Sequence, residues 1–200
     1  MDIIELIEEY NTTYGDKLNK KVEFLSLLNK DELLTSLINK GMVVIDNESL
    51  PFDHLVQNEW YDKFQKDNEG NWVSFNVEFV KELKQSELLN KSSQNNFEGI
   101  FSKVNEIIKK LNAREIKGAG QMTKYDLALY IGAYLEVHPD KVYIHRGVIK
   151  GARLLELISN NDETIMDVAD ILNVRPELEQ LGEALYIEDF LCVLKHLKKK

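Results

Sequence analysis

The sequence predicts a mainly α-helical protein, and three observations support this fold class. The 200 residues include only three prolines and ten glycines, which is few for a fold built from many strands and turns. Several segments place apolar residues at the spacing of one helix face. With 44% hydrophobic and 30% charged residues, the chain has enough apolar surface to fold around a core.

The first part of the chain, residues 1–92, is expected to form a smaller N-terminal region of helices with some β structure. Residues 42–45 (Met-Val-Val-Ile) and 72–75 (Trp-Val-Ser-Phe) have the composition of two short strands, and a β-hairpin is a possible feature of this region. Helices are predicted within residues 1–40, 51–65 and 79–89.

A polar stretch at residues 90–96 (NKSSQNN) is the expected boundary before a helical domain at 97–200. Just beyond it, five apolar residues share the spacing of one helix face and predict a strong amphipathic helix: Ile100, Val104, Ile107, Ile108 and Leu111. Further helices are predicted over residues 154–158, 162–172 and 187–197.

Composition also limits where the protein is expected to work. The single cysteine, Cys192, lies in an apolar run, so it is predicted to be a core residue in a reducing, cytoplasmic environment. Acidic residues near the start exclude a signal peptide, and no apolar run approaches the ~20 residues of a membrane span. The sequence therefore predicts a cytoplasmic protein with no membrane partner.

One stretch, residues 114–153, differs in charge from the rest of this acidic chain. It holds seven lysines or arginines and four acidic residues, a balance of +3, whereas the whole chain carries a net charge of −9. It also holds five of the ten glycines. A local basic region in an acidic protein indicates an anionic partner that is bound at one place.

Within this stretch the sequence predicts a helix, a Gly-x-Gly turn at Gly118 and Gly120, and a second helix. Thr123 is the expected N-cap of the second helix, with Asp126 in the place of the capping-box partner. Glycines let backbone N–H groups approach an anion, and a helix N-terminus favours phosphate. Lys117 and Lys124 flank the turn.

The segment at about 104–135 resembles the helix-hairpin-helix motif. The residues that carry the resemblance are Ile116, Gly118, Ala119, Gly120 and Ala128. The resemblance implies that the turn binds a nucleic-acid backbone without reading its sequence. In the motif the backbone amides of the turn make this contact, here at Gly118 and Gly120. The neighbouring side chains that could also donate to a phosphate are Lys117, Gln121, Thr123 and Lys124, and Arg146 and Lys150 could add a second contact.

More distantly, the region resembles the helix-hairpin-helix DNA glycosylases, whose hairpin is followed by a loop and a catalytic aspartate. The position of the lysine used by bifunctional members is Met122 here. Where the aspartate is expected, the chain offers Tyr143, Ile144 or His145, with Asp140 close by. The resemblance therefore implies a non-catalytic or degenerate relative, with His145 and Asp140 as weak catalytic candidates. His145 has the pKa range of a general base.

Three interpretations remain open at this stage. The first is a non-catalytic or degenerate glycosylase-like protein that contacts a DNA or RNA backbone. The second is a protein-interaction module in which Gly118 and Gly120 are purely structural. The third is an active base-processing enzyme that uses Asp140 or His145. No cofactor is expected, and no metal either, because His138, Asp140 and His145 are too few ligands for a metal site.

Overall fold

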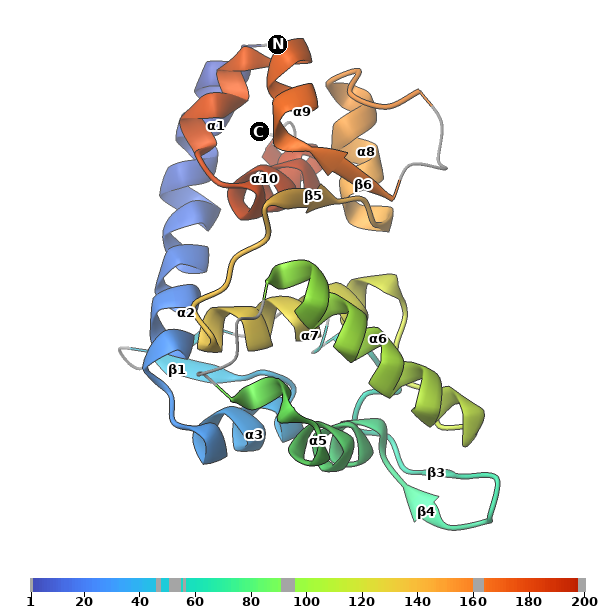
Figure 1. Ribbon diagram of the computed structural model, residues 1–200. Coiled ribbons are helices and arrows are strands. Elements are labelled where there is room, and N and C mark those ends of the chain that lie inside the picture. The colour runs from blue at the N-terminus through green and yellow to red at the C-terminus, as the bar shows by residue number, and fades with distance from the viewer. Residues whose placement is uncertain are drawn as a thin grey trace. The chain divides into compact units, whose positions relative to one another are not determined.

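The computed structural model describes residues 2–45, 48–50, 55, 57–90, 96–159 and 164–197, and it confirms a mainly α fold (Figure 1). The chain divides into two compact units. Unit 1 contains residues 1–19 and 139–200, and unit 2 contains residues 20–138. None of the helices in the described part of the chain combines the length and the apolar character needed to cross a membrane.

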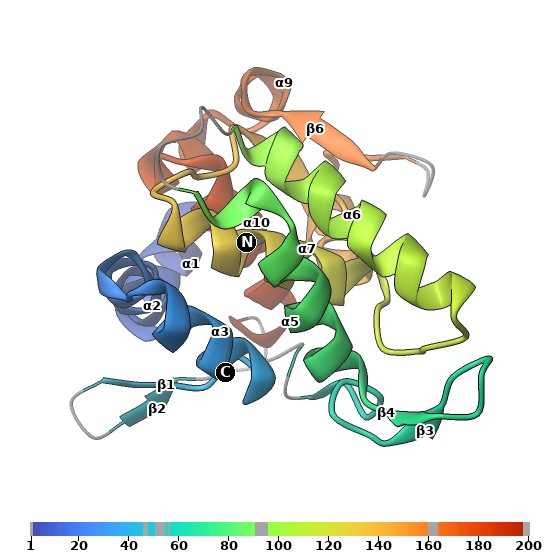
Figure 2. The same ribbon diagram turned by 60° about the horizontal axis from the view of Figure 1, so that its bottom comes forward.

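Unit 2 is built on four helices that pack in chain order, each against the next: α3 (Lys30–Ile38), α5 (Phe75–Gln85), α6 (Phe97–Ala113) and α7 (Gln121–Tyr134). Figure 2 shows these neighbours together with the end of α2 (Asp16–Leu27), which begins in unit 1. A 3₁₀ turn, η2 (Glu87–Leu89), follows α5. The boundary expected at residues 90–96 falls inside this unit, because α5 packs against α6; residues 91–95 lie outside the described residues.

The α6 helix confirms the amphipathic pattern of its sequence. Asn96 caps its N-terminus by accepting a hydrogen bond from the Gly99 N–H, and its apolar face is buried. Its C-terminus is closed by two backbone bonds, from Glu115 to Asn112 and from Ile116 to Leu111. Glu115 takes the left-handed conformation at φ 61°, which is usually left to glycine at this position.

Two small antiparallel ladders complete unit 2. The first joins β1 (Val43–Ile45) to β2 (Glu48–Leu50), and the second joins β3 (Gln65–Lys66) to β4 (Trp72–Val73). Strands form at both predicted places, and each pairs antiparallel with a segment close by in the sequence. The helix predicted to reach residue 65 is wrong at its end, where β3 forms; residues 51–54 and 56 lie outside the described residues.

Unit 1 combines both ends of the described chain. Its elements are α1 (Ile3–Tyr10), a π-helical turn η1 (Asn11–Gly15), β5 (Lys141–Tyr143), α8 (Arg146–Leu154), β6 (Ile165–Asp167), α9 (Val168–Val174), the 3₁₀ turn η3 (Pro176–Leu181) and α10 (Ala184–Leu197). One apolar core holds them, with Ile7, Val148, Phe190 and Leu191 among its fully buried members. The helix predicted over 162–172 begins only at Val168, because β6 pairs antiparallel with β5; residues 160–163 are outside the described residues.

The tightest packing in unit 1 is between α8 and α10. A methyl group placed on Gly151 would lie 2.0 Å from the carbonyl oxygen of Leu191, and one on Gly147 would lie 2.6 Å from the Cys192 Sγ. Helices approach this closely only where one of them lacks a side chain. Gly147 and Gly151 are four residues apart and therefore share the α8 face that meets α10.

Candidate nucleic-acid interface

The turn between α6 and α7, residues 114–120, is the centre of the candidate site. Gly118 is buried in this turn at φ +155°, and an added Cβ would lie 2.3 Å from the Phe75 Cγ. Only glycine can adopt this positive φ and also fit against Phe75 without a rearrangement of the turn. Gly120 differs, because a Cβ there would meet open space. Gly118 therefore shapes the turn from inside, whereas Gly120 lies at its surface.

Two side-chain amides from the preceding segment hold the backbone of this turn. The Gln65 Nε2 donates to the Lys117 carbonyl oxygen (2.7 Å), and the Lys117 N–H donates to the Gln65 Oε1 (2.8 Å). The Asn58 Nδ2 donates to the Gly118 carbonyl oxygen (2.5 Å) and to the Thr123 Oγ1 (3.0 Å). Two carbonyl oxygens, which would repel an anion, are thereby bonded within the protein.

The N-terminus of α7 has no side-chain cap. Its N-cap is Gly120, not Thr123, so the predicted capping box with Asp126 is wrong. Thr123 is buried in the first turn, because its hydroxyl accepts the bond from Asn58. The first helical backbone bond runs from the Lys124 N–H to the Gly120 carbonyl. The N–H groups of the first turn before Lys124 have no acceptor within the helix.

The basic residues of this region play different parts. Arg114 lies 2.9 Å from Glu78 and 3.7 Å from Asp67, so its charge is balanced. Burial alone would raise the pKa of the Glu78 carboxyl, but hydrogen bonds from Lys81 and Arg114 hold that pKa below its usual value. Lys124 donates to the Asn105 Oδ1 (2.9 Å). Lys117 and Gln121 are exposed.

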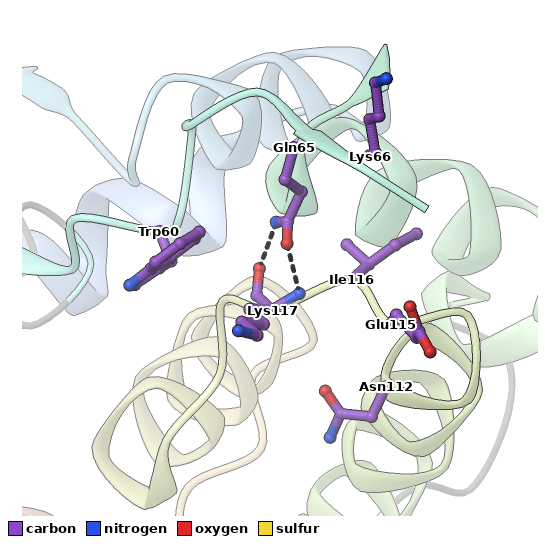
Figure 3. A pocket seen from close by; sticks show the side chains of 7 residues that line it. All are labelled: Trp60, Gln65, Lys66, Asn112, Glu115, Ile116 and Lys117. Atoms are coloured by element: carbon purple, nitrogen blue, oxygen red, sulfur yellow. Dashed lines mark hydrogen bonds between the residues drawn. The ribbon is translucent and has the colours of Figure 1, made fainter. Parts of the chain in front are cut away.

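A groove with a volume of about 550 Å³ lies beside the turn (Figure 3). It is lined by Trp60, Gln65, Lys66, Asn112, Glu115, Ile116 and Lys117. Of these residues, the sequence pattern singled out only two. Lys117 was predicted as a contact residue, and Ile116 was a position of the motif. The signal that could have found the others is the interleaving of Trp60, Lys63, Lys66 and Trp72, a pattern typical of surfaces that bind nucleic acid.

The remaining predicted site residues belong to unit 1. Arg146 and Lys150 are exposed on α8, one turn apart. Asp140 is exposed just before β5. His145 is 3% exposed and is the N-cap of α8. Unit 1 thus carries its own short basic face, and the predicted contact residues are divided between the two units.

His145 and Glu188 are buried and form a cluster with the half-buried Cys192. Its Nδ1 accepts from the Gly147 N–H (3.2 Å), so the ring proton is on Nε2, which donates to the Glu188 Oε1 at 2.5 Å. The ligand atoms of the three residues lie within 4.8 Å of one another, as in a metal site. However, Nε2 and the Glu188 Oε1 already share a proton in a direct hydrogen bond, and a metal on Nδ1 would remove the cap of α8. The cluster is therefore best explained as a packed polar contact between α8 and α10.

Comparisons with protein-family models, with curated proteins and with solved structures find no match to this chain.

Proposed function

We propose that unit 2 binds the sugar–phosphate backbone of a nucleic acid at the turn between α6 and α7, as a helix-hairpin-helix-type contact. The observation that carries this proposal is the arrangement of backbone groups at the turn. The carbonyls of Lys117 and Gly118 are bonded inward, and the N-terminus of α7 lacks a side-chain cap. A phosphate oxygen at the Gly120–Gln121 corner would take the place of that cap.

The geometry narrows the set of contacting residues. Gly118 and Thr123 are buried and shape the turn, whereas Lys117, Gly120 and Gln121 are exposed. Lys117 supplies the cation, and the α7 N–H groups supply fixed donors. This contact is independent of base sequence, because every nucleotide offers the same phosphate.

The affinity should be modest and sensitive to salt. A chain with a net charge of −9 repels polyanions over most of its surface, so only the local contact favours binding. Dissociation constants in the non-specific range of about 10⁻⁴ to 10⁻⁶ M are expected, and they should weaken as salt rises.

Gly120 offers a direct test, because several side chains fit there without a clash. Gly120→Asp places a carboxylate at the N-cap, where it would accept the α7 N–H groups itself and repel phosphate. The fold should keep its thermal stability or gain some, while binding to a labelled oligonucleotide, measured by fluorescence anisotropy in low salt, should disappear.

Two further variants at the same position complete the series. Gly120→Ala adds neither a cap nor a charge and should bind like the parent protein. Gly120→Ser caps the helix without a charge and should bind with intermediate affinity. Unchanged binding by Gly120→Asp would overturn the proposal.

A further inference from the structure

The groove beside the turn has an aromatic wall. Trp60 is 38% exposed and lines one side, and Figure 3 shows Asn112 and Glu115 on the other side of the bonded pair Gln65 and Lys117. A large aromatic side chain is usually buried when it has a purely structural role. An indole that lines an open groove instead offers a flat apolar face to a ligand.

Three lysine ammonium groups lie over the two tryptophan rings. The Nζ atoms of Lys63 and Lys117 are 4.4 Å and 5.4 Å from the centre of the Trp60 ring, and that of Lys66 is 5.4 Å from the Trp72 ring. In the described part of the chain, no ion pair with a carboxylate joins these lysines. Their flexible stems allow them to exchange a ring face for a phosphate oxygen.

The charged groups of the groove are unevenly placed. Lys117 provides a cation next to Trp60, whereas Figure 3 shows Lys66, Glu115 and Asn112 on the side away from Trp60. A phosphate is favoured near Lys117 and disfavoured near Glu115. The Glu115 and Asn112 side chains suit the edge of a base, because a carboxylate accepts bonds from ring amino groups.

We infer that this groove receives an unpaired nucleobase, which stacks on Trp60 while its phosphate contacts Lys117, so the natural ligand is single-stranded nucleic acid. This inference rests on the proposed function, since the same strand would contact the α7 N-terminus. A base in a duplex has both faces covered by its neighbours and cannot stack on a side chain. A volume of about 550 Å³ is within the range of small-ligand sites.

The two tryptophans make a direct measurement possible, because the chain has no others. Trp72→Phe leaves Trp60 as the sole tryptophan, and Trp60→Phe leaves Trp72. Intrinsic fluorescence of each variant is followed during titration with oligonucleotides of about eight units. The probes are single-stranded oligocytidine, oligothymidine, the same length of abasic strand, a duplex, and free cytidine monophosphate.

The expected result is saturable quenching of Trp60 by the single strands, with weaker binding of the duplex and of the free nucleotide. Trp60→Ala should weaken single-strand binding about tenfold or more. Oligocytidine should bind more tightly than oligothymidine, and Glu115→Gln should reduce that difference. The Glu136→Gln variant is the charge control, because Glu136 has the same left-handed conformation at the end of α7.

Other outcomes separate the two proposals. Equal binding of abasic strand, duplex and single strand without quenching would overturn the base pocket and leave the backbone contact intact. If free cytidine monophosphate quenched Trp60 as strongly as the oligomer does, the natural ligand would be a nucleotide. The assignment of a single strand would then be overturned. No binding of any probe in low salt would overturn both proposals.

Discussion

The side-chain amide of Gln65 is bonded to both backbone groups of Lys117, 52 residues further along the chain. Gln65 is 9% exposed, whereas Lys117 is exposed, so the two bonds are partly shielded from water. The contact joins β3 to the turn between α6 and α7 and fixes the direction in which that turn presents its peptide groups. Loss of Gln65 should therefore affect stability and binding together.

Gln65→Ala should lower the free energy of unfolding by about 1–3 kcal/mol, because it removes two part-buried hydrogen bonds to the backbone of Lys117. Urea denaturation would measure the change. Gln65→Glu is the matched variant, since it keeps the acceptor for the Lys117 N–H and loses only the donor. An alanine variant as stable as the parent protein would show that water replaces the amide at no cost.

Gly118→Ala should destabilise unit 2 by about 2 kcal/mol or more, since the methyl group meets Phe75 and the backbone is left-handed. Gly120→Ala should cost less than about 1 kcal/mol, because its methyl group points into open space. Thermal unfolding of both variants checks the contrast. Similar melting temperatures would contradict the close contact with Phe75.

Gly151→Ala should destabilise unit 1, because the methyl group would force α8 away from the Leu191 carbonyl oxygen. A loss of about 2–3 kcal/mol is expected from such overpacking. Lys150→Ala, at an exposed position of the same helix, is the control and should change stability by less than about 0.5 kcal/mol. Equal effects of the two variants would argue against tight packing of α8 on α10.

Glu156→Gly should stabilise the protein by about 0.5–1 kcal/mol, since Glu156 follows α8 at φ 60°. Glycine adopts this conformation without the steric cost of a Cβ. Glu136, at φ 58° after α7, should respond in the same way. A fall in melting temperature for both would mean that these glutamates contribute contacts that outweigh the backbone cost.

Acid should weaken the contact between Glu78 and Arg114. The pKa of Glu78 is lowered from its ordinary value of 4.5 by folding, so the folded state binds fewer protons than the unfolded state. The stabilisation is therefore fully present above about pH 4.5 and is lost as the pH falls through the lower, folded value. The difference in melting temperature between the parent protein and Arg114→Gln should be constant near neutral pH and shrink in acid. A difference that grows in acid would reverse the assigned sign.

Local patterns in the sequence were sufficient to predict the helices that carry the site. The apolar spacing from Ile100 to Leu111 requires only one helix face and one partner surface, and the two glycines mark the turn that follows. The cap was mispredicted because Thr123 has the right chemistry but a distant residue, Asn58, bonds its hydroxyl. Rules for helix capping consider only neighbouring residues, so they do not include a contact between residues 65 positions apart.

The groove could not be predicted from local sequence patterns. Its walls come from segments about 50 residues apart, around Trp60 and around Asn112, and are joined only by tertiary contacts such as that of Gln65 with Lys117. The buried pair of His145 and Glu188 was missed for the same reason, since 43 residues separate its members. A carboxylate partner for His145 could not be chosen among 34 acidic residues from spacing alone.

Unit 1 is made of two segments that are far apart in the sequence, and this affects the order in which the two units can fold during synthesis. The α1 helix packs against α10, so its apolar face is covered only after a segment more than 170 residues further along has been synthesised. Unit 2 is continuous and can fold while the rest is still being translated. Ile3 and Ile7 therefore lack their α10 partners during that interval.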